Sequence, residues 1–589
     1  EKLKNCHYVS TREFANGGWK PISASTYYGK IPCKKEKSLS PIQAYLDLRQ
    51  LKQGRVQKHL RSGYNKLEKK EWLISRLKEP PRLALKHLAN PGGMSRGVER
   101  TKYNYNVYNK KICGLMQEIG ININKLPTVR AQCSTASTHE SIRAKIDKEP
   151  NPQHPELHED LYKIFLYNVD KKYKNTFSEV SWETLEPGLN KKGAPGFLEK
   201  VNRLGDYLTP EGKRQVDKLI KSMMQGKVPQ YYETAIPKNE KRDVTEDLLE
   251  LGEWPEKKPR IIQYPEAKMR IAITKVMYNW VKQQPLVIPG YEGKTPIFNI
   301  FNKVKKEWDQ FQKPTIISFD TKAWDTQVTP KDLELVARIQ KWFYKKKYHK
   351  FIEALTEEMK EVAVITEDGQ VYIRKGQRGS GQPDTSAGNS ILNVLTMAWA
   401  FCRANEVDYR TFSKIAKIHV CGDDGFLITE EHLAKRFSEE GPRLLEEAGK
   451  PQKLLSGTSM KASQDFSDLE FCSHTPVKVR LSSGATTYMA GRDTAIILSK
   501  MATKLDESGV RGSEEYENQV AFCFLLMYPW NPLVRRICLY IMSTTPYKEP
   551  NPTSPILIQY RGDPIGAFKD VYGFELRSIE RAEMTKLSQ

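Results

Sequence analysis

The sequence lacks the features that mark several common protein classes. It has nine cysteines in 589 residues, an odd number without a Cys-x-x-Cys pair, which argues against a disulfide framework and a structural zinc site. Its longest nearly continuous apolar stretch, residues 520–530, is too short to cross a bilayer. Residues 1–30 have no signal-peptide core, and the chain has no internal repeat. These absences predict a reducing, cytosolic environment.

Positive charge, by contrast, is in excess. The sequence carries 94 basic and 71 acidic residues, a net charge of +23, which indicates an anionic partner. The basic run 345–347 is interleaved with aromatic residues, a pattern typical of nucleic-acid binding. Such binding is expected to weaken steeply with added salt. The length and the 39% hydrophobic content predict several subdomains around a shared sheet.

An acidic tripeptide, Gly422-Asp423-Asp424, lies between two apolar runs at residues 418–421 and 425–428. Apolar runs around a Gly/Asp turn predict a β-hairpin. Two adjacent carboxylates at its tip suit a divalent metal in phosphoryl transfer. The alternative is a solvated turn without a ligand.

A second acidic cluster lies about a hundred residues upstream. The apolar run 315–319 predicts a buried strand that ends at Asp320, and residues 330–344 have the periodicity of a helix. If this strand neighbours the hairpin, Asp320 and Asp423 converge at the end of one sheet and can share a pair of divalent ions. Asp325 has an alternative role as the cap of the following helix.

A glycine-rich loop, residues 376–390, lies between these clusters. It follows a predicted hairpin that turns at residues 368–369, and it precedes an apolar helix at 391–401. Backbone N–H groups of such a loop can bind a phosphate or a nucleic-acid backbone. Thr385 and Asn389 would share one helical face. A flexible connector is the alternative interpretation of this loop.

These patterns, taken in order, resemble motifs A, B and C of viral RNA-dependent RNA polymerases: Asp-x-x-x-x-Asp at 320–325, Ser-Gly-x-x-x-Thr-x-x-x-Asn at 380–389, and Gly-Asp-Asp at 422–424. Further blocks resemble the pestivirus polymerases, at residues 231–244, 262–268, 287–296, 320–329 and 470–477. The similarity covers most of the chain from about residue 100 onward and thins over the first hundred residues.

The resemblance implies an α/β right-hand fold closed around a central channel. Residues 1–113 would form an N-terminal region, 114–288 and 326–385 the fingers, 289–325 and 386–475 the palm, and 476–589 a mainly helical thumb. The palm would supply an antiparallel sheet with the acidic residues.

The implied function is RNA-dependent RNA polymerisation that replicates a positive-strand viral genome. Asp320, Asp423 and Asp424 would bind two Mg²⁺ ions, with Mn²⁺ able to substitute, and the Thr321 carbonyl would be a further ligand. One ion would activate the 3′-hydroxyl and the other would hold the triphosphate. Initiation without a primer is implied by the family alone.

Substrate contacts follow from the same resemblance. The motifs assign ribose recognition to Asp325, Thr385 and Asn389, where the 2′-hydroxyl distinguishes RNA from DNA. Ser380 and Gly381 would lie in the loop that adjusts to template and nucleotide.

Basic residues of the implied finger strands would bind the triphosphate: Lys238, Lys258 and Arg260. A solvated charged hairpin is the alternative for these clusters. Either Lys450 or Lys453 would protonate pyrophosphate in the motif D region, and the sequence leaves both open.

Two further sites are implied near the thumb. The primer-grip turn would comprise Phe471, Cys472 and Ser473. Arg492 and Lys504 would contact an initiating GTP. Related polymerases usually carry Arg near position 504, and Lys lacks the forked geometry of Arg.

Partners would be a single-stranded RNA template, nascent RNA, nucleoside triphosphates and other viral replicase proteins. The expected location is the host cytoplasm, on the cytosolic face of ER-derived membranes. Pestivirus polymerases carry a hydrophobic C-terminal anchor past the end of this chain, which predicts a truncated or processed form. Two other classes stay open: a non-catalytic RNA-binding protein, which leaves the strand-end carboxylates unexplained, and a two-metal nuclease, which leaves the ribose residues unexplained.

Two further patterns are expected to be incidental. Residues 293–295 end like a phosphate-binding loop, but Ile288 occupies the position of its required glycine. His154 and His158 are four residues apart, but the surrounding prolines argue against a zinc-binding helix and favour a surface loop.

Overall fold

The computed structural model describes residues 12–15, 18–21 and 85–89 and most of residues 107–583. Within the last range, the gaps are 124–125, 132–137, 139–140, 143, 146–150, 198, 200, 244–258, 288–298, 367–370, 455–458, 505–513 and 549–554. Lys258, Ile288, the 293–295 pattern and the predicted turn at 368–369 therefore lie outside the described residues.

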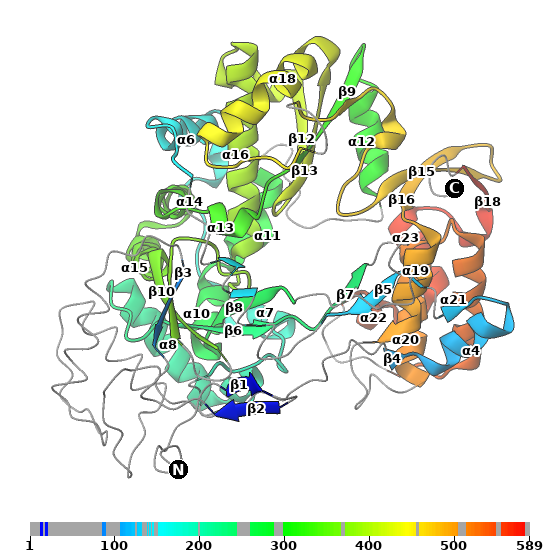
Figure 1. Ribbon diagram of the computed structural model, residues 1–589, viewed down its shortest axis with the longest axis horizontal. Helices are drawn as coiled ribbons and strands as arrows, with labels where there is room; N and C mark the ends of the chain where they lie inside the picture. The colour runs from blue at the N-terminus through cyan, green and yellow to red at the C-terminus, as the bar shows by residue number, and fades with distance from the viewer. Residues whose placement is uncertain are drawn as a thin grey trace.

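A four-stranded antiparallel sheet carries both acidic clusters, in the upper part of Figure 1. Its strands, in spatial order, are β12 (Ala416–Cys421), β13 (Asp424–Glu430), β9 (Pro314–Asp320) and β14 (Ala462–Ser463). β12 and β13 form the predicted hairpin, and β13 pairs with β9. The predicted pairing of the hairpin with the strand at 315–319 is confirmed.

Both faces of this sheet are buried, which explains why its strands have continuous apolar runs rather than alternating ones. Ile316 and Ile317, adjacent on β9, belong to different hydrophobic cores. α12 (Ile300–Trp308) packs on one face, and α16 (Thr385–Asn405) and α18 (Glu431–Glu447) pack on the other. The helix predicted at 391–401 is confirmed as part of α16.

A second sheet contains the other predicted hairpin. Its strand order is β3 (Leu85–Ala89), β11 (Val371–Lys375), β10 (Glu361–Thr366), β6 (Glu233–Pro237) and β8 (Ile261–Pro265). β10 and β11 are antiparallel, as predicted, whereas β10 and β6 are parallel. The helices of this region are α8 (Pro210–Met224), α10 (Ala267–Val276), α14 (Pro330–Phe343) and α15 (His349–Lys360). α14 confirms the helix predicted at 330–344.

A third body, at the right of Figure 1, contains the C-terminal residues. Its sheet has the order β16 (Thr486–Gly491), β15 (Thr475–Leu481) and β18 (Ile579–Glu583). Its helices are α19 (Thr494–Ala502), α20 (Glu514–Met527), α21 (Pro532–Thr544), α22 (Pro555–Tyr560) and α23 (Pro564–Tyr572).

A helix from the other end of the sequence completes this body. α4 (Lys110–Glu118) packs against α20 and α21, and its Ile112 and Met116 are fully buried in the same core. β4 (Val107–Tyr108) pairs with β17 (Thr503–Lys504). The subdomain boundaries remain predictions, but α4 is clearly part of the C-terminal body.

The C-terminal body is also joined to the strands that precede β8. β5 (Thr128–Arg130) pairs with β7 (Lys241–Asp243). Lys241 Nζ donates to the Lys500 carbonyl at 2.6 Å, and burial lowers the pKa of Lys241 to about 8. The contact therefore ties a buried amine to α19.

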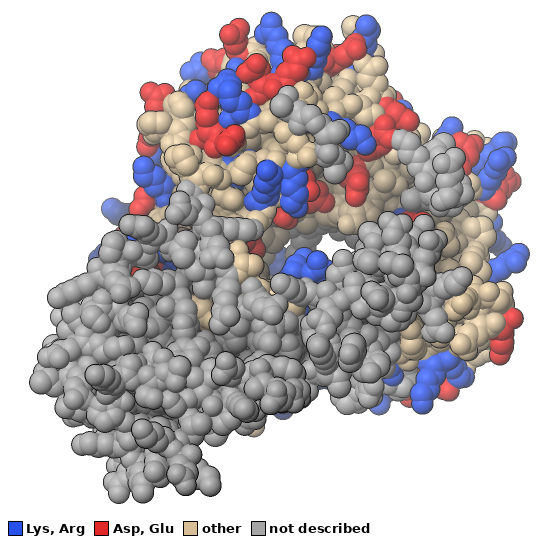
Figure 2. All heavy atoms as spheres, viewed as in Figure 1, with Lys and Arg blue, Asp and Glu red and all other residues tan. Residues whose placement is uncertain are grey.

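The remaining α-helices and strands are β1 (Arg12–Ala15), β2 (Gly18–Pro21), α6 (Leu157–Asn168), α7 (Trp182–Leu185), α11 (Tyr278–Val287), α13 (Trp324–Gln327) and α17 (Phe412–Ile415). Across the described part of the chain, no helix is both long and apolar enough to span a bilayer. Figure 2 shows an opening near the centre of this face, with Lys and Arg side chains at its edge.

Candidate active site

The end of the first sheet brings three aspartates together. Asp320 on β9 is the direct partner of Asp424 on β13, and Asp423 precedes Asp424 in the hairpin turn. The negative charges of Asp320 and Asp325 act on Asp423. The sequence clusters at 320–325 and 422–424 therefore meet in space.

Two glycines allow the turn to have this shape. Gly422 has φ of +64°, a conformation that residues with a Cβ rarely adopt. A Cβ on Gly425 would lie 2.5 Å from the Phe319 ring, so β13 can approach β9 closely only with glycine there. From α16, the Ser390 hydroxyl accepts from the Gly422 N–H at 2.8 Å, and Asn393 Nδ2 donates to the Gly422 carbonyl at 3.1 Å.

The electrostatics of the cluster reflect crowded carboxylates. Burial raises the pKa of Asp423, and the charges of Asp325 and Asp320 raise it further. Burial also raises the pKa of Asp424 to about 6, with a contribution from the charge of Asp423. A cation would relieve this repulsion, and the donors are the hard oxygens that Mg²⁺ prefers.

The carboxylates also have protein partners. Asp424 Oδ2 accepts from the Cys472 backbone N–H, and Lys453 Nζ lies 3.4 Å from Asp320 Oδ1. Among the described residues, no three His, Cys, Asp or Glu side chains converge into a metal-binding group. The metal-ligand roles of the aspartates and of the Thr321 carbonyl therefore stay predictions.

A segment after α18 lies along the end of β9. Gln452 Oε1 accepts from the Asp320 N–H at 2.9 Å, and Gln452 Nε2 donates to Thr321 Oγ1 at 2.9 Å. The Lys453 N–H donates to the Asp320 carbonyl at 2.8 Å. Sequence analysis missed Gln452, because an isolated glutamine carries no recognisable signal.

Lys450 and Lys453 have different environments, which separates the two candidates of motif D. Lys450 is 1% exposed, and its Nζ lies 2.9 Å from Asp332 Oδ2. Lys453 is 57% exposed and faces Asp320. Lys453 is therefore the lysine with access to the aspartates.

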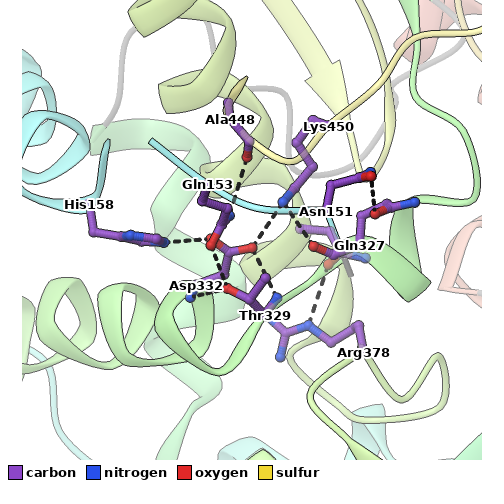
Figure 3. Close-up of polar contacts among 10 residues, drawn as sticks. Asn151, Gln153, His158, Gln327, Thr329, Asp332, Arg378, Ala448 and Lys450 are labelled. Carbon is purple, nitrogen blue, oxygen red and sulfur yellow. Dashed lines mark hydrogen bonds and ion pairs between the residues drawn. The ribbon is translucent and has the colours of Figure 1, made fainter. Parts of the chain in front are cut away.

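Asp332 lies between His158 and Lys450 in a buried polar network (Figure 3). His158 Nε2 lies 2.8 Å from Asp332 Oδ1, and Gln153 Nε2 donates to the same oxygen at 3.0 Å. Burial alone would raise the pKa of Asp332, but the charge of Lys450 and the His158 hydrogen bond hold it well below its usual range. The surface-loop prediction for His158 was wrong, since the residue lies in α6 and joins this network.

The three residues predicted to recognise the ribose do not form a single hydrogen-bonded group. Asn389 Nδ2 donates to Asp325 Oδ1 at 3.1 Å. Thr385 Oγ1 instead donates to the Gly379 carbonyl at 2.6 Å. The capping alternative for Asp325 was wrong, because Thr329 caps α14.

The glycine-rich loop packs tightly against β8. Ser380 Oγ donates to the Ile261 carbonyl at 3.1 Å, and the Gly381 N–H donates to the Gln263 carbonyl at 2.8 Å. A Cβ on Gly381 would lie 2.8 Å from that carbonyl oxygen. The loop is thus held by specific contacts.

Two predicted triphosphate residues gather around an acidic residue that sequence analysis did not single out. Arg260 Nε donates to Glu240 Oε1 at 2.7 Å, and Lys238 Nζ lies 3.5 Å from Glu240 Oε2. Hydrogen bonding to Glu240 raises the pKa of Arg260, and the charges of Asp423 and Asp325 add to this effect. Arg260 therefore lies within electrostatic reach of the aspartates.

The predicted primer-grip residues form a tight turn beside Asp424. Cys472 and Ser473 have φ of +51° and +63°, and Phe471 pairs with His474 across the turn. Phe471 is buried against Phe426 of β13. The turn thus holds the Cys472 N–H at the Asp424 carboxylate.

The two residues predicted to contact GTP have different surroundings. The charge of Arg492 acts on His474 and Tyr528. Lys504 is 8% exposed, and its charge acts on Glu517. Their role with GTP stays a prediction, and the burial of Lys504 does not favour it.

His474 provides a pH-dependent contribution to stability. Burial lowers the pKa of His474 to about 4. Its Nδ1 lies 2.7 Å from the Cys472 carbonyl and its Nε2 lies 2.7 Å from the Tyr528 hydroxyl. Because an acceptor faces Nδ1, the neutral ring carries its proton there and accepts from Tyr528.

We expect this contribution to be present above pH 6.5 and lost as the pH falls toward 4, since the unfolded chain binds the proton more readily. The stability deficit of His474→Gln relative to wild type should shrink by about 2 kcal/mol between pH 7.5 and 4.5. Urea unfolding at several pH values measures it, with the exposed His432→Gln as control. A deficit that is constant with pH would contradict the assignment.

Comparison with known proteins identifies the surrounding domain. Residues 233–513 match the family model described as viral RNA dependent RNA polymerase. That range includes the sheet-end aspartates, the glycine-rich loop and the Arg260 cluster.

The whole chain is also similar to viral genome polyproteins. It is 55% identical to that of bovine viral diarrhea virus (strain SD-1) and 54% identical to that of classical swine fever virus (strain Alfort/Tuebingen), over all of this chain. The chain spans 15% of the length of each polyprotein. Over 42% of the chain, it is 27% identical to 8% of the genome polyprotein of hepatitis C virus genotype 1c (isolate India). The resemblance to pestivirus polymerases is confirmed, and residues 233–513 form a domain of the viral RNA-dependent RNA polymerase family.

Proposed function

We propose that this chain copies a positive-strand viral RNA genome by nucleotidyl transfer at Asp320, Asp423 and Asp424. The observation that carries the proposal is the pairing of Asp320 with Asp424, next to Asp423, at the end of one sheet. Carboxylates from separate strands are what a pair of divalent ions requires.

The aspartates fit Mg²⁺ by their donor chemistry and by the crowding that raises the pKa of Asp423. Bound divalent ions, Mg²⁺ or Mn²⁺, would activate the attacking 3′-hydroxyl and neutralise the leaving pyrophosphate. In this proposal Asp320 and Asp423 hold the cations, and Asp424 and the Thr321 carbonyl assist.

Basic side chains would position the triphosphate. Arg260 and Lys238 already bracket a carboxylate of Glu240, and the forked guanidinium of Arg260 suits phosphate oxygens equally well. Lys258 is proposed to join them. Lys453 is our choice for the proton donor to pyrophosphate, because Lys450 is held by Asp332.

We propose that Asp325 and Asn389 read the 2′-hydroxyl, with Thr385, Ser380 and Gly381 shaping the loop around them. The hydroxyl is a donor and an acceptor at once. Asn389 retains a second N–H and Asp325 a second oxygen, so the pair offers both partners.

Replacing Asn389 with Ala should lower the ratio of kcat/KM for ribonucleotides over deoxyribonucleotides by about tenfold, the value of one lost hydrogen bond. Single-nucleotide extension with each substrate measures the ratio. Asn405→Ala, which removes two hydrogen bonds at the far end of α16, should leave it unchanged. An unaltered ratio in Asn389→Ala would count against the sugar-reading role.

The right-hand architecture is also part of the proposal. Fingers at 114–288 and 326–385, a palm at 289–325 and 386–475, and a thumb at 476–589 would enclose the template around the central opening. The net charge of +23 supports an RNA-filled channel. Primer-independent initiation, with Arg492 and Lys504 near the first GTP and residues 471–473 gripping the primer end, rests on the resemblance.

By the same resemblance, we propose that the chain acts with other viral replicase proteins in the host cytoplasm, on the cytosolic face of ER-derived membranes. The single-stranded template, the nascent RNA and the nucleoside triphosphates are its proposed substrates and products.

One assay tests the proposed activity. Purified chain is incubated with a single-stranded RNA template, Mg²⁺ or Mn²⁺, and labelled ribonucleotides. A templated product is the expected result. A shortened template would indicate a nuclease, and RNA retention without chemistry would indicate a binding protein; either outcome overturns the proposal.

A further inference from the structure

Arg378, in the glycine-rich loop, has a guanidinium group that is only partly hydrogen-bonded among the described residues. The residue is 3% exposed, and its Nε donates to Asn389 Oδ1 at 3.3 Å. Its Nη1 and Nη2 atoms are buried without a hydrogen-bond partner among the described residues. An arginine in this state is costly, because buried polar groups are normally paired.

Arg374, four residues earlier, shows what a structural arginine in this region looks like. Its Nη1 donates to Glu233 Oε1 at 2.5 Å and to Gln263 Oε1 at 2.6 Å, and its Nε donates to the Gly376 carbonyl at 3.1 Å. Every nitrogen of that guanidinium has an acceptor. Arg378 differs in that no carboxylate of the described residues forms an ion pair with it.

The surrounding backbone makes room for Arg378. Its backbone N–H donates to the Asp325 carbonyl at 2.8 Å. A Cβ on Gly388, in the first turn of α16, would lie 1.8 Å from Arg378 Nη2. The guanidinium therefore lies against a glycine of the helix, adjacent to Asn389.

These contacts form a chain from Arg378 to the acidic cluster. Arg378 Nε donates to Asn389 Oδ1, and Asn389 Nδ2 donates to Asp325 Oδ1. With its oxygen held by the guanidinium, the Asn389 amide cannot rotate to present that oxygen to Asp325. The amide N–H groups are thereby directed to Asp325 and its neighbourhood.

We propose that Arg378 is a positioning residue for sugar selection, an inference that rests on the proposed role of Asn389 and Asp325. It fixes the polarity of the Asn389 amide and so keeps one donor and one acceptor aimed at the 2′-hydroxyl. Its unpaired nitrogens leave a positive charge beside this pair, which strengthens the hold on the amide oxygen.

The test compares Arg378→Met, Arg378→Lys and Asn389→Ala with the double variant Arg378→Met/Asn389→Ala. Each is assayed for kcat and KM with ATP and dATP on one RNA template. Arg378→Met should lower the ATP/dATP ratio of kcat/KM by roughly tenfold, the effect of a hydrogen bond to a charged group. The loss should appear as a higher KM for ATP with little change for dATP. Lys keeps the charge but lacks the Nε geometry, so Arg378→Lys should recover only part of the ratio.

The double variant should select ATP no less well than Asn389→Ala alone, because the arginine acts through that amide. Arg403→Met is the matched control: it removes an arginine at the other end of α16 that pairs with Asp160 and should leave the ratio unchanged. Thermal unfolding of each variant reports stability separately. If Arg378→Met does not fold, the ATP/dATP ratio of Arg378→Lys decides whether the proposal holds.

The possible outcomes distinguish a failure of the role of Arg378 from a failure of the proposed sugar-reading role of Asn389 and Asp325. If Asn389→Ala lowers the ratio but the Arg378 variants do not, or if the two effects simply add, the role of Arg378 is overturned and the sugar-reading pair stands. If Asn389→Ala itself leaves the ratio unchanged, both fail.

Discussion

Replacing Asp423 with Asn should lower nucleotide incorporation by about a thousandfold or more, because the charge stabilisation of a metal-assisted transfer is worth several kcal/mol. Asp320→Asn should have an effect of the same order, since the two strands supply the cluster jointly. The variants keep the size of the side chain, so the sheet and its turn should persist. Single-turnover extension of an RNA primer–template measures the loss.

Template binding should change much less than chemistry, by a few-fold at most, because RNA affinity comes from many basic residues. Fluorescence anisotropy with labelled RNA measures it at fixed salt. Asp309→Asn, at an exposed aspartate paired with Lys305, is the matched control and should remain fully active. Near-normal incorporation by Asp423→Asn would remove the basis of the proposed mechanism.

The second large effect is expected at the buried Lys450–Asp332 pair. Lys450→Met should lower the free energy of unfolding by about 3–5 kcal/mol, because it leaves a buried carboxylate without its cation. Asp332→Leu should cost a similar amount for the same reason. Urea denaturation measures both, with Lys461→Met at an exposed position as control.

The double variant Lys450→Met/Asp332→Leu should recover much of the lost stability, since neither charge remains buried. The polymerase activity of the double variant should stay low, because without the Lys450–Asp332 pair the 450–453 segment no longer holds the side chains of Gln452 and Lys453 at Asp320. Recovery of stability without activity would show that the pair positions the segment. A double variant as unstable as the sum of the singles would contradict this account.

The sequence was sufficient where one local pattern decided the structure. Strand β9 and the β12–β13 hairpin were predictable because apolar runs end at Gly and Asp. The Asp325 cap alternative was wrong although the correct signal was present: Thr329, Pro330 and Asp332 form a better helix start, with reciprocal hydrogen bonds between Thr329 and Asp332.

Other features depend on contacts between distant segments and leave no local trace. Glu240 lies in a charged stretch that the sequence also allowed to be a solvated hairpin. Only the fold shows that Arg260 pairs with Glu240. His158 had an unfavourable sequence context, yet α6 brings it to Asp332. The choice between Lys450 and Lys453 required knowing which one is buried.

The packing of α4 into the C-terminal body has a consequence for how the chain can move. Because α4 lies among α20 and α21 while β5, shortly after it, pairs with β7, this stretch works as a tether between two bodies. The hydrogen bond from Lys241 Nζ to the Lys500 carbonyl is a second link to the C-terminal body. Movement of the C-terminal body away from β7 would therefore have to break the Lys241–Lys500 hydrogen bond and strain the connection from α4 to β5.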